Sequence, residues 1–389
     1  MVASGKIGIL TGGGDVPGLN SVIKSVAYRA SEMGKAVVGI RKGWKGLTHL
    51  TNPHDPTYVL PLDWMNTRTI DRTGGTVLHT SRTNPIKMSG AKLPDHLSKE
   101  HLAKLKFDGK NYDFTPIVLE SLDKLGIGCL VAIGGDDTLS FASILSQTGF
   151  PVIGVPKTMD NDVQGTEYCI GFSTAVTRAA DAINRQRTTI GSHERIGIFR
   201  IFGRDAGFTA LYTAYVTGAR CLIPEFPFNL DLAIRLLLED KLSNPSGYSM
   251  VIMSEGAIWE EGTVPETGDA DAFGHKKKID VGKAFAEEIS RRSGEETINS
   301  DLTYDLRSGA PDAIDQIVAT TFGNIASDLI ADGVSGRMVG VQKGCYAHMP
   351  LPDTKLGPRK VDLATLYNKD RYRPSYTGKL GMPLLFNKI

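Results

Sequence analysis

The chain has 389 residues, 41% of them hydrophobic and 22% charged, and its 44 basic and 43 acidic residues leave a formal net charge of +1. This length exceeds one typical hydrophobic core, so we expect a globular protein with two domains or lobes. The near-neutral balance excludes a general electrostatic attraction to nucleic acid or to an anionic membrane, so any anion site must be built locally.

The four cysteines, Cys129, Cys169, Cys221 and Cys345, are scattered and form no C-x-x-C pair. This spacing favours free thiols over a zinc site or a disulfide framework. No apolar run is long enough to span a bilayer, and the first residues do not resemble a secretory signal because their apolar stretch is short and runs into glycines. We therefore expect a cytoplasmic protein.

Short apolar runs alternate with longer amphipathic segments along the chain. Strands are expected at 6–10, 129–133, 151–155, 195–202, 248–254 and 336–342, and helices at 19–34, 138–149, 172–189, 207–218 and 312–333. Repeated strand–helix pairs predict an α/β protein with mainly parallel sheets flanked by helices. In such sheets, binding sites lie beyond the carboxyl ends of the strands.

Two further segments differ in composition. Residues 85–112 are polar and lysine-rich and are expected to form a surface insertion. The tail after about Leu351 is rich in Pro, Lys, Arg and Tyr, and we expect it to pack over the body of the protein.

The first expected strand is followed by a glycine loop, LTGGGDVPGLN, from Leu10 to Asn20. Glycines let backbone N–H groups approach a phosphate closely, and the dipole of the following helix favours an anion. The loop fits neither the Walker pattern nor G-x-G-x-x-G, so a plain strand–helix turn is an equal alternative.

Two more polar loops follow expected strands: GGDDT (134–138) and PKTMDND (156–162). An aspartate beside a glycine cradle can hold Mg²⁺ against phosphate oxygens, although a helix-capping role is the alternative for one of the two. In the third loop a carboxylate could accept a proton from a substrate hydroxyl while the lysine steadies a phosphoryl group. A solvated turn is the alternative there, but three such loops together favour phosphoryl chemistry.

The basic residues near glycine-rich or strand-end positions are Arg72, Arg82, Arg195, Arg204 and Arg307. Guanidinium groups suit phosphate oxygens, but a surface or ion-pair role is the alternative for each one alone.

Seven segments occur in the order in which they stand in phosphofructokinases: GILTGGGDVPGLN, GGTVLHTSR, AIGGDDT, PKTMDND, SHERIGIFRIFGR, MSEG and LRSGAPD. Residues 6 to 345 therefore resemble that family. The resemblance implies two Rossmann-like lobes with the active site in the cleft between them, and a glycolytic phosphoryl transfer to the 1-hydroxyl of fructose 6-phosphate. We expect a phosphoryl-donor lobe of residues 1–171 with 306–356, and a sugar-phosphate lobe of residues 172–305 with 357–389.

The resemblance also implies roles on the donor side and at the reacting hydroxyl. Gly13 and Gly14 resemble the donor-binding loop, with Arg82 beside the transferring group. Asp136 resembles the aspartate associated with Mg²⁺, which makes Mg²⁺ the expected cofactor. Asp160 resembles the catalytic base that accepts the proton from the sugar hydroxyl. Thr158 and Asp162 flank this base in the sugar and metal region.

For the sugar phosphate, the matching residues are Phe202, Gly203, Arg204 and Glu255. Arg195 matches an arginine that usually reaches the site of a neighbouring subunit, so a homodimer or homotetramer is expected. The family's "GHxQR" stretch reads YDLR here, with Tyr304 in place of the histidine. We expect Tyr304 and Arg307 to bind the sugar phosphate, while the departure leaves the exact acceptor sugar open.

The phosphoryl donor is expected to be pyrophosphate. ATP-using relatives typically have glycine where Asp137 stands and usually lack a lysine where Lys157 stands, whereas pyrophosphate-using relatives resemble this chain at both positions. A carboxylate about 4 Å from a nucleotide α-phosphate would cost ~4 kcal/mol at an effective dielectric near 20, which is about a thousandfold in affinity. Phe141 also stands where ATP users tend to have glycine, with an ordinary core residue as the alternative.

The nearest alternative is an ATP-dependent phosphofructokinase. GGDDT alone also resembles NAD and lipid kinases, which do not require PKTMDND or the FGR segment. A sugar-phosphate-binding regulatory subunit without activity is a third alternative, against which the intact Asp160, Thr158 and Asp136 argue. The poor dinucleotide fingerprint argues against a dehydrogenase.

Overall fold

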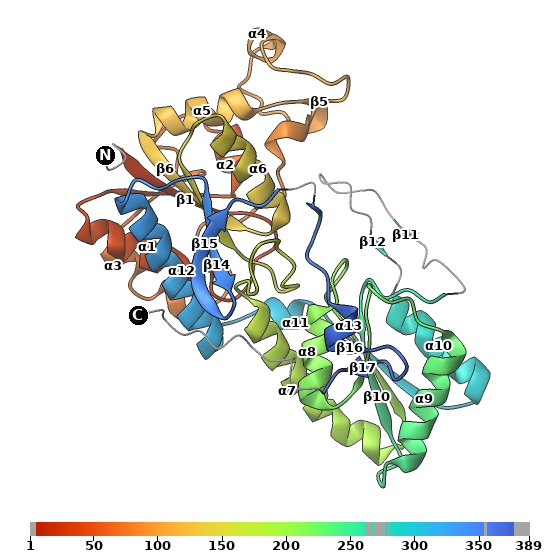
Figure 1. Cartoon of the computed structure of the whole chain (residues 1–389). Coiled ribbons are helices and arrows are strands. Elements are labelled where there is room, and N and C mark those ends of the chain that lie inside the picture. The colour runs from red at the N-terminus through yellow and green to blue at the C-terminus, as the bar shows by residue number, and fades with distance from the viewer. Residues whose placement is uncertain (1–4, 261–265, 268–276, 279, 354–355, 377–389) are drawn as a thin grey trace.

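The computed structural model describes residues 5–260, 266–267, 277–278, 280–353 and 356–376, and within them a seven-stranded and a four-stranded sheet form two lobes (Figure 1). Helices flank both sheets, so the α/β class expected from the sequence is confirmed. In the described part of the chain, no helix is both long enough and apolar enough to cross a membrane.

The larger sheet belongs to the first lobe and has the strand order β15-β14-β7-β6-β1-β2-β3. Its inner strands are parallel, and antiparallel pairs β2–β3 and β14–β15 close its two edges. The strands are β1 (Lys6–Thr11), β2 (Val37–Ile40), β3 (Val59–Leu62), β6 (Ile127–Gly134), β7 (Val152–Pro156), β14 (Arg337–Gln342) and β15 (Cys345–Pro350).

Helices cover both faces of this sheet because alternate side chains of a strand point to opposite faces. On β6, Val131 and Ile133 pack in the core that contains helices α1 (Leu19–Glu32) and α12 (Ala313–Ala331). Leu130 and Ala132 pack in the opposite core, with helices α2 (Trp44–Thr48), α5 (Thr115–Lys124) and α6 (Asp136–Gln147). Such a two-sided core requires the near-continuous apolar runs seen in the sequence.

The second lobe is built on a parallel sheet of order β13-β8-β10-β9. Its strands are β8 (Ile196–Ile201), β9 (Arg220–Leu222), β10 (Ser249–Ser254) and β13 (Thr297–Leu302), and its helices are α7 (Phe172–Ser192), α8 (Phe208–Thr217), α9 (Leu230–Ser243) and α10 (Val281–Ser293). One buried apolar cluster includes Ile9 of the first sheet and Ile198 of the second. Because the core is continuous between the lobes, the exact lobe boundaries expected from the sequence stay a prediction.

Residues 85–112 project from the end of the first lobe (Figure 1). They fold around a small core of Met88, Leu105 and Phe114. Their elements are η2 (Pro85–Lys87), β4 (Met88–Ser89), η3 (Gly90–Lys92), α4 (Lys99–Ala103) and β5 (Asn111–Tyr112). The remaining short elements among the described residues are α3 (Trp64–Thr67), η1 (Ile70–Arg72), β11 (Glu266–Thr267), β12 (Lys277–Lys278), α11 (Tyr304–Arg307), α13 (Leu363–Leu366), β16 (Tyr367–Asn368) and β17 (Arg373–Pro374).

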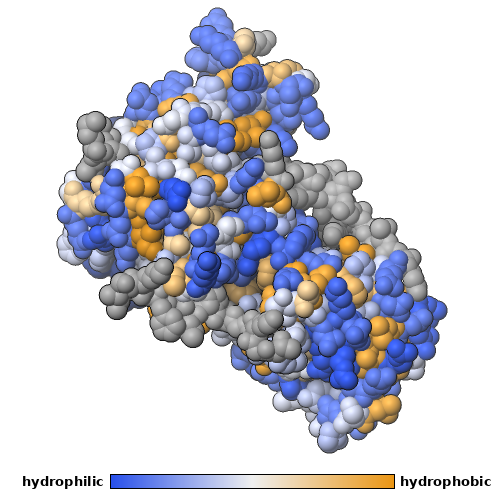
Figure 2. Space-filling model, viewed as in Figure 1, coloured by the Kyte–Doolittle hydropathy of each residue, from blue (hydrophilic) through white to orange (hydrophobic). Residues whose placement is uncertain are grey.

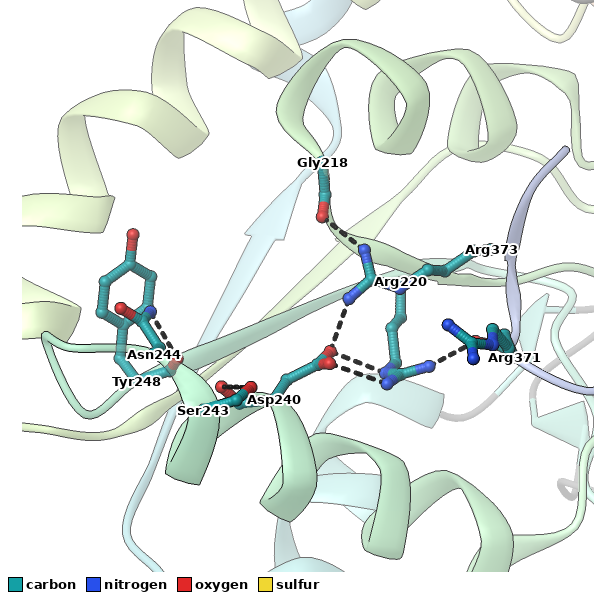
Figure 3. A network of polar contacts seen from close by, with 8 residues as sticks. All are labelled: Gly218, Arg220, Asp240, Ser243, Asn244, Tyr248, Arg371 and Arg373. Atoms are coloured by element: carbon teal, nitrogen blue, oxygen red, sulfur yellow. Dashed lines mark hydrogen bonds and ion pairs between the residues drawn. The ribbon is translucent and has the colours of Figure 1, made fainter. Parts of the chain in front are cut away.

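After β15 the chain leaves the first lobe and crosses to the second; we call residues 351–353 and 356–376 the C-terminal strap. Figure 3 shows how it is anchored: both Asp240 oxygens accept hydrogen bonds of 2.7 Å from Arg220, and one also accepts from Arg373 at 2.7 Å. Arg220 in turn donates to the Arg371 carbonyl. A buried arginine with a bidentate carboxylate is a geometrically specific contact, so the strap is held in one register on the second lobe.

Candidate active site

A cavity of about 370 Å³ lies beyond the carboxyl ends of strands β1, β6, β7 and β8. It brings together ten of the residues singled out in the sequence: Gly13, Gly14, Arg82, Asp136, Asp137, Lys157, Thr158, Asp160, Asp162 and Arg204. Hydrophilic residues gather over the junction of the two lobes on the face shown in Figure 2. The cavity is therefore polar and crowded with charged groups from both lobes.

The glycine loop after β1 forms one wall, and Lys157 lies against it. Gly13 has φ of 75°, which favours glycine, and a Cβ there would lie 3.4 Å from the Lys157 ammonium. The ammonium donates a hydrogen bond to the Gly14 carbonyl, and the residue as a whole is only 3% exposed. Burial, followed by the charge of Arg307, lowers the pKa of Lys157 to about 8. The Gly13–Gly14 loop is thus packed against a buried cation that can lose its proton near pH 8.

Asp136 and Asp137 form the first turn of α6, directly after β6. The N-cap is Gly135, so neither aspartate has the capping position considered in the sequence. Burial, together with the charges of Asp162, Asp137 and Asp205, raises the pKa of Asp136 to about 7. The helix N-terminus favours an anion here, but the crowded carboxylates repel one another.

The loop after β7 holds Asp160. Asn161 adopts φ of 53°, its side chain donates to the Glu167 carbonyl at 3.1 Å, and its amide oxygen accepts from the Cys169 N–H at 2.8 Å. The Asp160 N–H donates to the Thr158 hydroxyl at 3.1 Å. Oδ1 of Asp160 is buried and has no hydrogen-bond partner among the described residues. Burial, then the charges of Asp162 and Glu255, raises the pKa of Asp160 well above its usual value.

The cavity suits Mg²⁺ that arrives with a phosphorylated substrate. In the described residues, no group of three or more His, Cys, Asp or Glu side chains converges into a cage for a metal ion. Mg²⁺ commonly needs only one or two carboxylates, because substrate phosphates and waters complete its shell. Asp136 fits this requirement, since a divalent cation would stabilise the ionised carboxylate, which burial and the neighbouring aspartates disfavour.

The second lobe contributes Arg204, whose Nε donates to Asp205 at 3.0 Å. Gly203 precedes it with φ of 125°, and a Cβ there would lie 2.7 Å from the Ala206 carbonyl. Phe202, Gly203 and Glu255 do not line the cavity, although the charge of Glu255 acts on Asp160. Their roles in binding sugar stay predictions.

Arg307 packs against the glycine loop that follows β1. Its Nε donates to the Asp15 carbonyl at 3.0 Å and is 3.3 Å from the Asp15 carboxylate, and its guanidinium abuts Gly14. It also lies 5.7 Å from the centre of the Phe202 ring. Tyr304 is 73% exposed, and neither residue lines the cavity. Their expected contact with the sugar phosphate stays a prediction.

Arg195 lies away from the cavity of its own chain. It precedes β8, whereas Arg204 follows it, so the strand separates the two by roughly 20 Å at about 3.3 Å per residue. Its side chain pairs with Glu296 at 2.6 Å. Its expected role in the site of a neighbouring subunit stays a prediction.

Phe141 lies in the core and does not line the cavity. It is 2% exposed and packs edge-on against Trp44 with ring centres 4.7 Å apart. It is therefore a core residue of α6, which is the alternative interpretation, and it carries no information about the donor.

Sequence reasoning missed nine residues that line the cavity: Gly135, Thr138, Ser140, Gln164, Asp205, Pro352, Asp353, Gly357 and Pro358. Asp205 could have been found, because it directly follows Arg204 in the motif FGRD. The four strap residues carry no comparable signal, since only the path of the chain after β15 brings them to the site.

A second cavity, of about 720 Å³, lies under the 85–112 insertion and shares Arg82 with the first. Its basic lining residues are Lys45, His49, Arg82, Lys87, Lys92 and His96. Burial, followed by the charges of Lys45 and His96, lowers the pKa of His49 to about 4, so this imidazole is neutral at pH 7.

Comparison with known proteins shows the family of the chain. Residues 6–330 match the family model Phosphofructokinase. A pyrophosphate–fructose 6-phosphate 1-phosphotransferase of Amycolatopsis methanolica is 39% identical over 342 residues, covering 87% of this chain and 90% of that one. An ATP-dependent 6-phosphofructokinase 3 of Streptomyces coelicolor is 35% identical over 340 residues, 87% of this chain and 91% of that one.

The fold is also that of solved relatives. A pyrophosphate-dependent phosphofructokinase from Marinobacter aquaeolei superposes with a TM-score of 0.74 and 19% identity, covering 95% of this chain and 89% of that one.

Proposed function

Because this chain belongs to the phosphofructokinase family, we propose that it transfers a phosphoryl group from pyrophosphate to the 1-hydroxyl of fructose 6-phosphate. The products are fructose 1,6-bisphosphate and phosphate, and the reaction runs in both directions with Mg²⁺. The observation that carries this proposal is the Asp160 carboxylate, which faces a phosphate-binding loop across one cavity and keeps an unpartnered buried oxygen.

Asp160 serves as the general base. The sugar 1-hydroxyl donates its proton to this carboxylate while its oxygen forms the new bond to phosphorus, and the bond from phosphorus to the bridging oxygen breaks. Burial and the neighbouring carboxylates raise the pKa of Asp160 well above its usual value, and a more basic carboxylate accepts a proton more readily. Most of the remaining catalysis comes from positioning and charge stabilisation.

The donor wall binds pyrophosphate. The Gly13–Gly14 loop and the N-terminus of α6 line the cavity, where a helix N-terminus favours an anion, and Arg82 and Lys157 supply positive charge. Mg²⁺ on Asp136, when bound, neutralises pyrophosphate oxygens. Lys157, whose ammonium donates to the Gly14 carbonyl at the edge of the cavity, stabilises the leaving phosphate.

Pyrophosphate is favoured over ATP by Asp137 and Lys157, which line the same cavity. A carboxylate at about 4 Å from an α-phosphate opposes the nucleotide by ~4 kcal/mol, whereas compact pyrophosphate ends before it. The second candidate function is ATP-dependent transfer, because relatives of that name are 35% identical to this chain. The intact Asp160 loop disfavours a regulatory subunit without activity.

We further infer a cytoplasmic homodimer or homotetramer in which Arg195 reaches the fructose 6-phosphate site of the neighbouring subunit. The placement of Arg195 away from its own cavity supports this assembly. The free cysteines support a reducing compartment, since three of the four are buried thiols.

The test is a donor assay on fructose 6-phosphate with Mg²⁺, with pyrophosphate or ATP as the sole phosphoryl donor. We expect turnover with pyrophosphate and little with ATP, and a loss of about 10²- to 10⁴-fold in kcat for Asp160→Asn. Turnover with ATP alone would reverse the donor assignment. Full activity of Asp160→Asn would remove Asp160 as the base.

A further inference from the structure

Arg359 of the C-terminal strap holds the loop that carries Asp160. Its Nη2 donates to the Asn161 carbonyl at 2.6 Å and to the Glu167 carbonyl at 3.3 Å. Its backbone N–H donates to the Asp162 carbonyl at 2.6 Å. One strap residue thus makes hydrogen bonds to three carbonyls of the loop, all of them in the segment that follows Asp160.

The next two strap residues hold the facing loop of the second lobe. The Lys360 ammonium donates to the Asp205 carbonyl. The Val361 N–H donates to Glu225 Oε1 at 3.0 Å, and this same oxygen accepts from the Gly207 N–H at 3.0 Å. Residues 359–361, which we call the clamp, therefore join the Asp160 loop of one lobe to the Arg204–Asp205 loop of the other.

Burial of the Arg359 guanidinium costs hydration free energy, which argues against an incidental contact. Its guanidinium lies 4.2 Å from the centre of the Phe208 ring, and its Nε is buried with no hydrogen-bond partner among the described residues. Burying a guanidinium without full hydrogen bonding is unfavourable unless other contacts offset the loss of hydration. Here the planar Arg359 guanidinium can stack on the Phe208 ring and donate to two carbonyls at the same time. It is also attracted by the Asp162 charge.

We propose that Arg359 is a positioning residue for the phosphoryl transfer. Through the clamp it sets the distance between the Asp160 loop and the Arg204–Asp205 loop. This inference rests on the proposed function, since it assumes that the two loops bind and activate one acceptor. Arg359 itself does not line the cavity and acts through the main chain of Asn161, Asp162 and Glu167.

The expected signature is a fall in kcat without a matching loss of donor binding. A misplacement of about 1 Å can cost roughly 10²-fold in rate, so we expect Arg359→Met to lower kcat by about 10- to 100-fold. KM for pyrophosphate should change less than about threefold, because the Gly13–Gly14 loop and Lys157 make no contact with the clamp. Arg359→Lys keeps the charge and one donor group and should fall between wild type and Arg359→Met.

The matched control is Arg371→Met. It removes the same charge from the same strap, but the described contacts of Arg371 use only its main chain. We expect its kcat to stay within about twofold of wild type, as for ordinary surface substitutions. An equal loss in both variants, or a kcat of Arg359→Met within twofold of wild type, would overturn the proposal.

Hydrogen–deuterium exchange supplies a readout that is independent of activity. Arg359→Met should speed exchange of the amides in 160–168 and 205–208, while Arg371→Met should leave both unchanged. Unchanged exchange in Arg359→Met would also overturn the proposal. If wild type shows no turnover with pyrophosphate, the proposed function fails while exchange still tests the clamp. If Arg359→Met does not fold, the same measurements on Arg359→Lys carry the test.

Discussion

At the scale of single residues, we expect the choice of donor to depend on the Asp137 carboxylate, which lies at the start of α6 and lines the cavity. Asp137→Gly removes a charge that opposes a nucleotide α-phosphate by ~4 kcal/mol at about 4 Å. We expect kcat/KM for ATP to rise by up to about a thousandfold and kcat/KM for pyrophosphate to change far less. The measurement is steady-state kinetics with each donor.

Ser140→Gly is the control for that substitution, because Ser140 also lines the cavity from α6 but carries no charge. It should leave the donor preference as it is. ATP turnover by Asp137→Gly that stays at the wild-type level would contradict the role of Asp137.

Lys157 gives a second prediction at this scale, because burial lowers its pKa to about 8. The ammonium that attracts pyrophosphate is present below that pH and lost as pH rises through it. We therefore expect kcat/KM for pyrophosphate, which reports the free enzyme, to fall above about pH 8. In Lys157→Arg the fall should move to higher pH, because a guanidinium keeps its charge. A wild-type profile that stays flat well above pH 8 would rule out this role for the ammonium.

At the scale of secondary-structure elements, α6 has two functions that separate along its length. Its first turn faces the cavity, and Phe141, one turn later, faces Trp44 in the core. Phe141→Ala should lower the free energy of unfolding by about 3–5 kcal/mol, measured by urea denaturation, and leave the donor preference unchanged. Phe107→Ala, at a position 53% exposed, should change stability little. A gain of ATP use in Phe141→Ala would restore Phe141 as a donor determinant.

At the scale of the whole molecule, the site draws on both lobes, and the assembly is expected to add Arg195 from a second subunit. We expect Arg195→Met and Asp160→Asn to be nearly inactive separately at low fructose 6-phosphate. After subunit exchange, a mixed dimer has one site with both intact residues, so about a quarter of all sites should become active. Size-exclusion chromatography of each variant checks that the assembly is unchanged. A mixture that stays inactive although its subunits exchange would place Arg195 outside the neighbouring site.

Short-range patterns in the sequence explain which parts of the fold and of the site could be predicted. Strand ends followed by glycine and aspartate loops were visible in the sequence, and parallel strands place such loops at one edge of the sheet. That is why Gly13, Asp136, Lys157 and Asp160 meet in one cavity as expected. The direction of each side chain was less accessible, as Phe141 shows, because one residue along a helix rotates a side chain by about 100°.

By itself, the sequence determined the α/β class, the family, and the residues of the three loops, because each depends on neighbours within one strand–loop–helix unit. Only the tertiary structure decided that Arg307 packs on the loop that contains Gly14 and Asp15, and that Pro352, Asp353, Gly357 and Pro358 of the strap line the cavity. It also decided that Arg359, 199 positions after Asp160 in the chain, holds the Asp160 loop. Such contacts arise where the chain returns after β15, and no local pattern encodes where a returning segment will pack.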